Sequence, residues 1–295
     1  MNKKAVEERL SKQAKDALKA RIRYERRFER ELEKEIQRYR EETPEFFRKS
    51  DREHKPRTIL AEGDSWARYS IGFAIPWHLP KIDDRNHVLN IASPGDTASE
   101  MLSGSNAAKL GRRIKMGPSR NRKFDVIFFS GGGNDLLGDG RFATFLRNYE
   151  DGMSPSELVN QSTLDAAFRC LSVHYINLIR LRDENSPNTL IYFNAYDFAP
   201  PTGKPACGFI GPWMRPHLEA TGAPDRMFGE VVNYFLGQYA SLLRQFIEHE
   251  GERLKVLDTQ GTLKEREWSN EIHPTTAGFR KIAKVVQKQL EEDFP

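Results

Sequence analysis

The 295-residue sequence has only two cysteines, Cys170 and Cys207, and neither lies in a CxxC motif or a Cys/His cluster. Two cysteines are too few for a disulfide scaffold, and the missing clusters exclude the common zinc motifs. No stretch approaches the roughly 18 consecutive apolar residues of a transmembrane helix. The basic N-terminus also lacks the apolar core of a secretory signal. These absences predict a reduced, cytoplasmic protein with no transmembrane segment.

Residues 51–295 carry almost no net charge. Residues 1–50 hold 16 Lys and Arg against 11 Asp and Glu, a net charge of +5, whereas residues 51–295 hold 30 against 31. The formal net charge of +4 therefore belongs to the N-terminal segment. A nearly neutral main domain offers no charge-based case for nucleic-acid binding, so no nucleic-acid partner is expected.

Residues 4–42 contain neither glycine nor proline and are rich in Ala, Leu, Glu, Lys and Arg, which predicts one long helix that Pro44 ends. Its apolar stripe comprises Leu10, Ala14, Leu18, Ile22, Phe28, Leu32, Ile36 and Tyr39. The stripe predicts packing on the rest of the chain, on a second copy or on a protein partner. The mixed charge of the other face argues against a membrane or nucleic-acid surface. We therefore divide the chain into an amphipathic helical extension, 1–50, and a main domain, 51–295.

From residue 57 onwards, short apolar runs alternate with amphipathic helical patterns. The runs are rich in β-branched or aromatic residues, and each ends in small or polar residues. They cover 58–61, 87–92, 125–130, 189–194 and 254–258, and the helical patterns lie near 97–110, 157–184, 226–250 and 275–292. This alternation predicts an α/β domain whose parallel sheet is covered by helices on both faces.

Polar clusters follow the first three predicted strands. They are Gly63-Asp64-Ser65, the turn containing Gly95, and Asn134 behind Gly131-Gly132-Gly133. Because ligands of open parallel sheets bind beyond the carboxyl ends of the strands, these clusters are expected at one edge. A serine on a tight turn can act as a nucleophile, and the Gly95 N–H and Asn134 amide can stabilise an oxyanion. The glycine run favours close approach of the backbone to a ligand, although each residue alone is equally consistent with an ordinary turn or cap.

A serine nucleophile needs a base, and His273 is the best placed of the seven histidines. Pro274 keeps His273 out of a helix, and Thr275 or Thr276 is expected to cap the final helix. A loop histidine directly before that helix can reach the carboxyl edge of the sheet. Histidines within the helical patterns have packing as a simpler explanation.

The blocks Gly63-Asp64-Ser65, Gly95, Gly132-Gly133-Asn134-Asp135 and His273-Pro274 occur in the order typical of SGNH (GDSL-type) hydrolases. The chain resembles that family over residues 57–292. The resemblance implies a flavodoxin-like three-layer α/β/α domain and a serine esterase with Ser65 as nucleophile and His273 as base. It also implies an oxyanion hole from the Ser65 N–H, the Gly95 N–H and the Asn134 side chain, with no metal or organic cofactor.

One position departs from the family pattern, because the usual aspartate three residues before the histidine is Asn270 here. Its amide oxygen can orient His273 by accepting from Nδ1–H, but it cannot stabilise the imidazolium by charge. Glu271 is one residue out of phase, so Asn270 is the predicted third catalytic residue. The change leaves open a weak or inactive binding or scaffold protein, and the N-terminal helix leaves open a partner-regulated effector.

Two apolar segments, 66–80 and 196–216, follow strands at the predicted active edge. They contain the predicted substrate-binding residues Trp66, Tyr196 and Trp213. Such walls favour an acyl-ester or lipid substrate over a phosphate or a sugar, since the chain has no phosphate-binding loop. The alternative is that both segments are loops that cover the sheet edge and bury each other.

Overall fold

The computed structural model describes residues 3–50, 55–69, 74–206, 208 and 210–295, and within the first helix it describes the side chains of Lys19, Arg23 and residues 26–48. Five parallel strands form one sheet in the order β2-β1-β3-β4-β5. The strands are β1 (Arg57–Gly63), β2 (Asn86–Asn90), β3 (Val126–Ser130), β4 (Leu190–Asn194) and β5 (Leu254–Leu257). Each lies within two residues of a predicted apolar run, so the predicted parallel sheet is confirmed.

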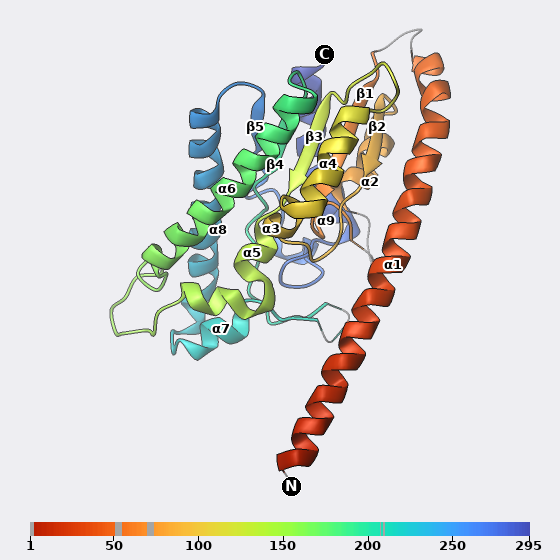
Figure 1. The fold of residues 1–295 in the computed structure, drawn as a ribbon. Helices are drawn as coiled ribbons and strands as arrows, with labels where there is room; N and C mark the ends of the chain where they lie inside the picture. Colours follow the sequence, from red (N-terminus) through yellow and green to blue (C-terminus); the bar gives the residue numbers. More distant parts are fainter. Residues whose placement is uncertain (1–2, 51–54, 70–73, 207, 209) are drawn as a thin grey trace.

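Helices cover both faces of this sheet, which makes three layers (Figure 1). On one face lie α3 (Ala98–Met101), α4 (Gly104–Met116), α6 (Gln161–Asn185) and α8 (Phe228–Glu250), and on the other lie α2 (Ile75–Ile82) and α9 (Thr276–Asp293). Two short helices, α5 (Gly133–Leu137) and α7 (Arg215–Ala220), belong to the loops beyond the strand ends. The predicted α/β/α class is confirmed. None of the helices in the described part of the chain is both long and apolar enough to cross a bilayer.

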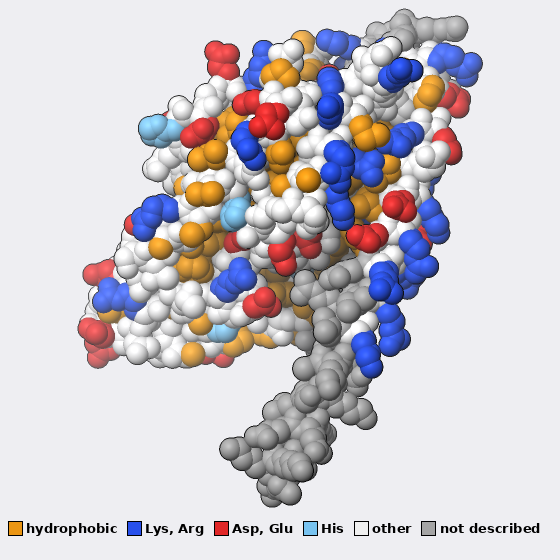
Figure 2. Space-filling model, in the orientation of Figure 1, with side chains coloured by type: hydrophobic (Ala, Val, Ile, Leu, Met, Phe, Trp, Pro, Cys, Tyr) orange, Lys and Arg blue, Asp and Glu red, His pale blue; other side chains and the backbone are white. Residues whose placement is uncertain are grey.

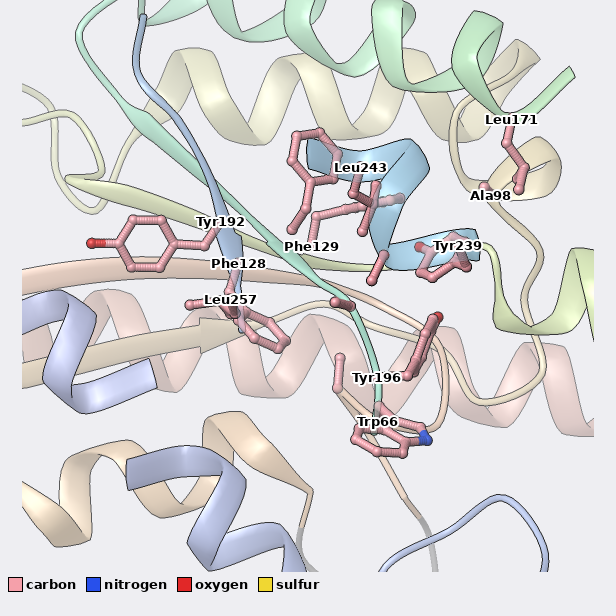
Figure 3. Close-up of a cluster of buried hydrophobic side chains, with 14 of the residues drawn as sticks. Trp66, Ala98, Phe128, Phe129, Leu171, Tyr192, Tyr196, Tyr239, Leu243 and Leu257 are labelled. Carbon is pink, nitrogen blue, oxygen red and sulfur yellow. The ribbon is translucent and has the colours of Figure 1, made fainter. Parts of the chain in front are cut away.

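The strand order explains the continuous apolar runs. Every residue of β1 and β3 is buried, because both strands are paired on two sides and covered on two faces. Figure 3 shows Phe128 and Phe129 of β3 among the core side chains, with Tyr192 of β4. The chain passes from β1 to β2 on one side and then crosses back to β3 on the other side of β1. The carboxyl ends of β1 and β3 therefore flank a switch point.

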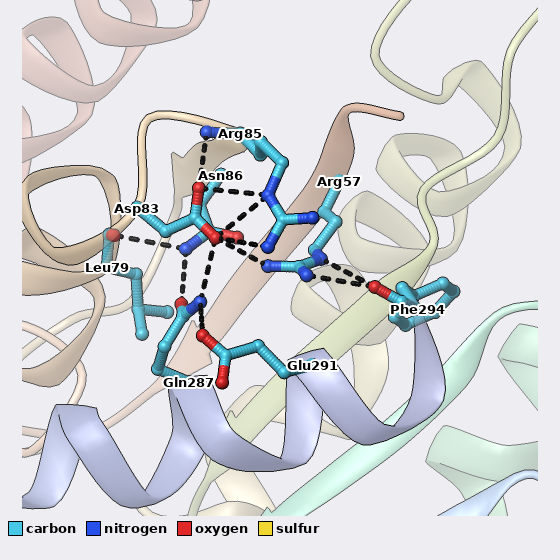
Figure 4. Close-up of polar contacts among 8 residues, drawn as sticks. All are labelled: Arg57, Leu79, Asp83, Arg85, Asn86, Gln287, Glu291 and Phe294. Atoms are coloured by element: carbon cyan, nitrogen blue, oxygen red, sulfur yellow. Dashed lines mark hydrogen bonds and ion pairs between the residues drawn. The ribbon is translucent and has the colours of Figure 1, made fainter. Parts of the chain in front are cut away.

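The opposite, amino-terminal edge is held by a polar network around the buried Arg57 guanidinium (Figure 4). Arg57 donates to Asp83 at 2.9 Å and to the carbonyl oxygen of Phe294 at 2.9 Å. Gln287 of α9 donates to Asp83 at 3.0 Å and accepts from Asn86 at 2.7 Å. Burial alone raises the pKa of Asp83, but hydrogen bonds and charge from Arg85, together with Arg57, lower it to about 2. The network ties β1, β2 and α9 together at the end of the sheet away from Ser65.

The N-terminal helix α1 (Lys3–Ser50) runs along the β2 edge of the sheet, and its N-terminal part extends beyond the domain (Figure 1). Ile36, Tyr39 and Phe47 are buried against the domain, and Tyr39 stacks on His87 of β2 with the ring centroids 4.0 Å apart. Lys and Arg side chains interspersed with acidic ones lie along its outward side (Figure 2). The described half of the predicted stripe thus packs on the chain itself. Leu10, Ala14, Leu18 and Ile22 lie outside the described side chains, so the oligomer and partner contacts stay predictions, as does the division at residue 50.

The prediction that Pro44 ends this helix is wrong, because α1 continues to Ser50. A proline inside a helix loses one backbone hydrogen bond and costs about 3 kcal/mol. Tertiary packing of the last turns offsets that cost. Phe46 stacks on His87 with centroids 4.4 Å apart, and the Arg122 guanidinium lies 3.7 Å from the Phe47 ring centroid.

Tyr39 offers a test of how firmly α1 is docked. Tyr39→Ala is expected to lower the free energy of unfolding by about 3 kcal/mol, because it removes a ring that is 5 % exposed and stacked on His87. Tyr39→Phe is the matched control. Its expected effect is neutral or stabilising, since the buried Tyr39 hydroxyl has no hydrogen-bond partner in the described part of the chain. Urea unfolding followed by circular dichroism measures both, and equal losses in the two variants would contradict the packing role.

Candidate active site

Ser65 lies on a tight turn directly after β1, as the sequence predicts. Gly63 has φ +150°, and a Cβ there would collide with the backbone of Ser130 on β3, so only glycine fits. The Asp64 N–H donates to the Ser130 carbonyl at 2.8 Å, and the Ala67 and Arg68 N–H groups donate back to the Asp64 carbonyl. These bonds fold the chain sharply and leave Ser65 at the carboxyl edge, 9 % exposed.

The Asp64 side chain holds this turn through three hydrogen bonds. One carboxylate oxygen accepts from the Trp66 N–H at 2.9 Å and the Ser130 hydroxyl at 3.0 Å, and the other accepts from the Tyr196 hydroxyl at 2.6 Å. The pKa of Asp64 is raised to about 6, because burial raises it by more than these three hydrogen bonds lower it. Asp64 therefore holds the turn through its side chain, a role that the sequence did not reveal.

His273 reaches Ser65 from the loop before α9. Its Nε2 lies 2.7 Å from Ser65 Oγ, and its Nδ1 lies 3.0 Å from Asn270 Oδ1. Thr275 caps α9 by accepting from the Gly278 N–H, as predicted. The Trp66 indole N–H also donates to the Ile272 carbonyl at 2.9 Å, which joins the serine turn to the histidine loop. The structure thus brings together all three predicted catalytic side chains, whose roles remain a prediction.

The hydrogen bonds around Asn270 determine which nitrogen of His273 carries the proton. Asn270 Oδ1 accepts from the backbone N–H groups of Ile272 at 3.1 Å and His273 at 3.0 Å. Backbone N–H groups can only donate, so this atom must be the amide oxygen, and the third group at it, His273 Nδ1, must also donate. Nε2 is then free of a proton and accepts from the Ser65 hydroxyl. This is the tautomer that a general base requires.

His273 itself is a strongly buried base. It is 5 % exposed, and burial lowers its pKa to about 3. Its ring stacks on Tyr69 with centroids 4.1 Å apart and meets Trp213 edge-on with centroids 5.7 Å apart. At neutral pH the imidazole is therefore neutral and ready to accept a proton, although forming the imidazolium is costly in this environment.

Glu271 does not compete with Asn270 for the histidine. Its buried carboxylate accepts four backbone N–H groups of the 203–215 segment, those of Gly203, Trp213, Met214 and Arg215. Glu271 therefore fastens this segment against the histidine loop. Its ranking behind Asn270 agrees with the geometry, but its role as an anchor was missed because its partners lie about 60 residues away in the sequence.

Within the glycine run before Asn134, Gly131 and Gly132 are crowded by the protein's own side chains. The Gly131 carbonyl accepts from the hydroxyls of Tyr175 at 2.9 Å and Tyr239 at 2.8 Å. Gly132 has φ +118°, and a Cβ there would lie 2.6 Å from the Tyr175 hydroxyl. For Gly131 and Gly132 the expectation of a close ligand is thus corrected, since they make room for tyrosines that fix the β3 loop, whereas Gly133 lines the cavity beside Ser65.

The predicted oxyanion donors lie on the loops after neighbouring strands. Gly95, after β2, has φ +88°, and its backbone is open, with no atom within 4 Å of where a Cβ would stand. Asn134, after β3, donates one amide hydrogen to the Asp96 carbonyl at 2.9 Å, which holds its side chain beside the Gly95 turn. A primary amide has two hydrogens, so one remains for a ligand.

An apolar cavity of about 40 Å³ opens beside Ser65 and Asn134. Its apolar lining comprises Trp66, Leu136, Leu137, Ala199, Phe235, Leu236 and Ile272, and the rest of the wall is formed by Asp64, Gly133, Tyr196, Asp197 and Tyr239. Trp66 and Tyr196 pack edge to face with centroids 5.2 Å apart (Figure 3). Of the predicted substrate-binding residues, Trp66 and Tyr196 thus line the cavity, whereas Trp213 contacts His273 instead. The described residues contain no group of three or more His, Cys, Asp or Glu arranged as metal ligands.

The segment 66–80 is only partly a loop. The expectation that 66–80 is all loop is wrong, because its second half belongs to α2, which packs on α9 and β2. Pro76 is compatible with the first turn of a helix. Pro80 lies inside the helix, where a proline argues against a helix in the sequence. Residues 70–73 of this segment and Cys207 and Phe209 of the other lie outside the described residues.

No protein-family model and no curated protein matches the chain. Solved structures do match it. A candidate platelet activating factor from Streptococcus pneumonia is 14% identical, with a TM-score of 0.52 over 93% of this chain and 99% of that one. A lipase from a goat rumen metagenome is 17% identical, with a TM-score of 0.50 over 79% and 96% of the two chains. Phospholipase A1 from Streptomyces albidoflavus is 13% identical, with a TM-score of 0.50 over 79% and 99%. The chain therefore shares the three-layer α/β/α fold of these solved structures.

Proposed function

We propose that this protein is a serine hydrolase that cleaves carboxylic esters through an acyl-enzyme on Ser65. The observation that carries the proposal is the 2.7 Å contact between Ser65 Oγ and His273 Nε2, with Nδ1–H directed to Asn270. As Oγ attacks the ester carbonyl, its proton passes to Nε2, and when the tetrahedral intermediate collapses, Nε2–H of His273 donates that proton to the departing alcohol. Water, deprotonated by the same nitrogen, then hydrolyses the acyl-enzyme.

We assign three N–H donors to stabilise the negative charge that develops on the carbonyl oxygen. These are the Ser65 N–H, the Gly95 N–H and the remaining amide hydrogen of Asn134, from loops after three adjacent strands. Preorganised donors of this kind commonly provide a rate factor of about 10²–10³ each. The alternative of an inactive binding protein is less well supported, because a disused site has no need for a buried serine–histidine contact in the productive tautomer.

The cavity supports an acyl group of modest length. At about 40 Å³ the cavity is small, so a short acyl chain fits it better than a long one. Its lining is largely apolar, which favours a hydrocarbon chain over a sugar or a phosphate. We therefore place the acyl group in this cavity and the alcohol on the open side of Ser65.

A fluorophosphonate probe tests the nucleophile. Wild-type protein is expected to gain one phosphonyl group, located by peptide mass spectrometry on Ser65, because the neutral His273 activates that hydroxyl. Ser65→Ala should remain unlabelled, whereas Ser172→Ala, a matched control whose hydroxyl only donates to the Phe168 carbonyl within α6, should label normally. Absence of label on folded wild-type protein would favour the scaffold alternative.

A series of p-nitrophenyl esters tests the acyl pocket. The ratio kcat/KM is expected to be highest for short acyl chains and to fall by about 10-fold or more at twelve carbons, because the longer chain exceeds the cavity. Leu136→Phe, which adds bulk to the lining, should lower the butyrate rate more than the acetate rate. A maximum at long chains would instead assign the lipid-like substrate to the 196–216 wall.

A further inference from the structure

The protonated form of His273 lacks the carboxylate that usually stabilises it. Its Nδ1 partner is the neutral Asn270, although the base must carry a positive charge at each transition state. The two nearby carboxylates are committed elsewhere. Asp64 binds Trp66, Ser130 and Tyr196, and Glu271 binds backbone N–H groups of the 203–215 segment. Within the described residues, no carboxylate hydrogen-bonds to this imidazole, so another group must offset the cost of its charge.

Tyr69 covers the face of the imidazole. The two rings are nearly parallel, with an interplanar angle of 24° and centroids 4.1 Å apart. A cation placed over the face of a tyrosine ring within about 6 Å of its centroid is attracted by the ring's electron density, and the attraction grows when water is excluded. Trp213 meets the imidazole at 85°, so Tyr69 is the ring that stacks on it.

The Tyr69 hydroxyl also holds the residue that orients His273. It accepts from Asn270 Nδ2 at 3.2 Å, on the opposite side of the amide from the oxygen that faces Nδ1. One side chain therefore contacts both the base and its orienting partner.

The chain fixes Tyr69 in place through its neighbour. Arg68 pairs with Glu35 of α1 at 2.8 Å, and its guanidinium also donates to the Asn90 carbonyl at the end of β2. The Tyr69 ring itself packs on Phe279 of α9, with centroids 6.1 Å apart. These contacts hold the backbone and the ring, so the stack exists before substrate binds.

We propose that Tyr69 is a positioning residue that stabilises protonated His273 through the face of its ring and aligns Asn270 through its hydroxyl, in place of a triad carboxylate. The kinetic consequence rests on the proposed function, but the effect on the imidazole does not. Tyr69→Leu removes the ring face and the hydroxyl, whereas Tyr69→Phe removes the hydroxyl alone.

The pKa of His273 is the decisive readout. It is measured by NMR titration of the imidazole in an Asn270→Asp background, where the added carboxylate brings the titration into an accessible range. Adding Tyr69→Leu is expected to lower this pKa by about one unit, and adding Tyr69→Phe by less than about 0.3. Tyr234→Leu, which removes a tyrosine that bonds only to Gln161, is the matched control and should leave it unchanged.

Kinetics supplies the second readout. With Asn270 intact, Tyr69→Leu is expected to lower kcat by about 10-fold with little change in KM, because the loss falls on the transition state. An unchanged pKa in Tyr69→Leu, or equal shifts in the Leu and Phe variants, would overturn the ring-face role even in an active enzyme. If the wild-type protein cleaves no ester, the proposed function fails, and the NMR titration still decides whether Tyr69 stabilises the charge.

Discussion

Ser65→Ala and His273→Ala are each expected to reduce kcat for ester hydrolysis by about 10⁵–10⁶-fold, and the double variant is expected to lose no more than either single one. The two side chains act as one unit, because Oγ is nucleophilic only while Nε2, 2.7 Å away, takes its proton. Once either is missing, the other has nothing to contribute. A residual rate above that in water is expected from the oxyanion donors and the acyl cavity.

Initial rates on a short-chain ester, with each variant checked for unfolding free energy, measure this effect. His249→Ala is a matched control, since that histidine is exposed in the last turn of α8, which leads into the start of β5 at the edge of the sheet opposite Ser65. Losses that multiply in the double variant would mean that Ser65 and His273 act independently. Retained activity in Ser65→Ala would exclude the acyl-enzyme altogether.

The sheet could be predicted from the sequence because its signal is local. The strands are short apolar runs that end in small polar residues, and parallel pairing then places Ser65, Gly95 and Asn134 at one edge. The end of α1 and the existence of α2 could not be predicted in this way. Pro44 lies inside α1 and Pro80 inside α2. Each helix tolerates its proline because side chains distant in the sequence pack against the helix.

The reacting groups of the site were predictable by residue type and order, but their surroundings were not. A serine after a strand and a histidine before the last helix have few other uses together. The commitments of Asp64 and Glu271 depend on hydrogen bonds across the fold, to Tyr196 and to the 203–215 segment. The stack of Tyr69 on His273 depends on side-chain conformation at a distance of 204 positions along the chain. Such contacts leave no periodic or motif signal.

Asn270→Ala is expected to lower kcat by about 10³-fold, with KM little changed. The substitution removes the acceptor for Nδ1–H and leaves the backbone N–H groups of Ile272 and His273 without their partner. The imidazole can then adopt the tautomer with the proton on Nε2, which cannot accept from Ser65. A wrong tautomer cost about 10⁴ in the serine protease case, and the stack on Tyr69 retains part of the ring orientation here. A loss below about 10-fold would mean that His273 is oriented by other groups.

Asn270→Asp is expected to act in the opposite direction and to change the pH dependence. The aspartate keeps the oxygen that faces Nδ1, and the Tyr69 hydroxyl can turn from acceptor to donor towards the second oxygen. The added negative charge raises the pKa of His273 from about 3. Because the base works only while neutral, activity is lost as pH falls through that pKa. The wild-type enzyme should therefore stay active well below pH 6, whereas the acid limb of kcat/KM in the Asp variant should move towards neutrality.

Above that limb the variant should be faster, by about 10-fold, since its carboxylate stabilises the imidazolium at the transition state. Profiles of kcat/KM from pH 4 to 9 for both proteins measure the shift, and coincident acid limbs would show that Asn270 does not control the charge on His273.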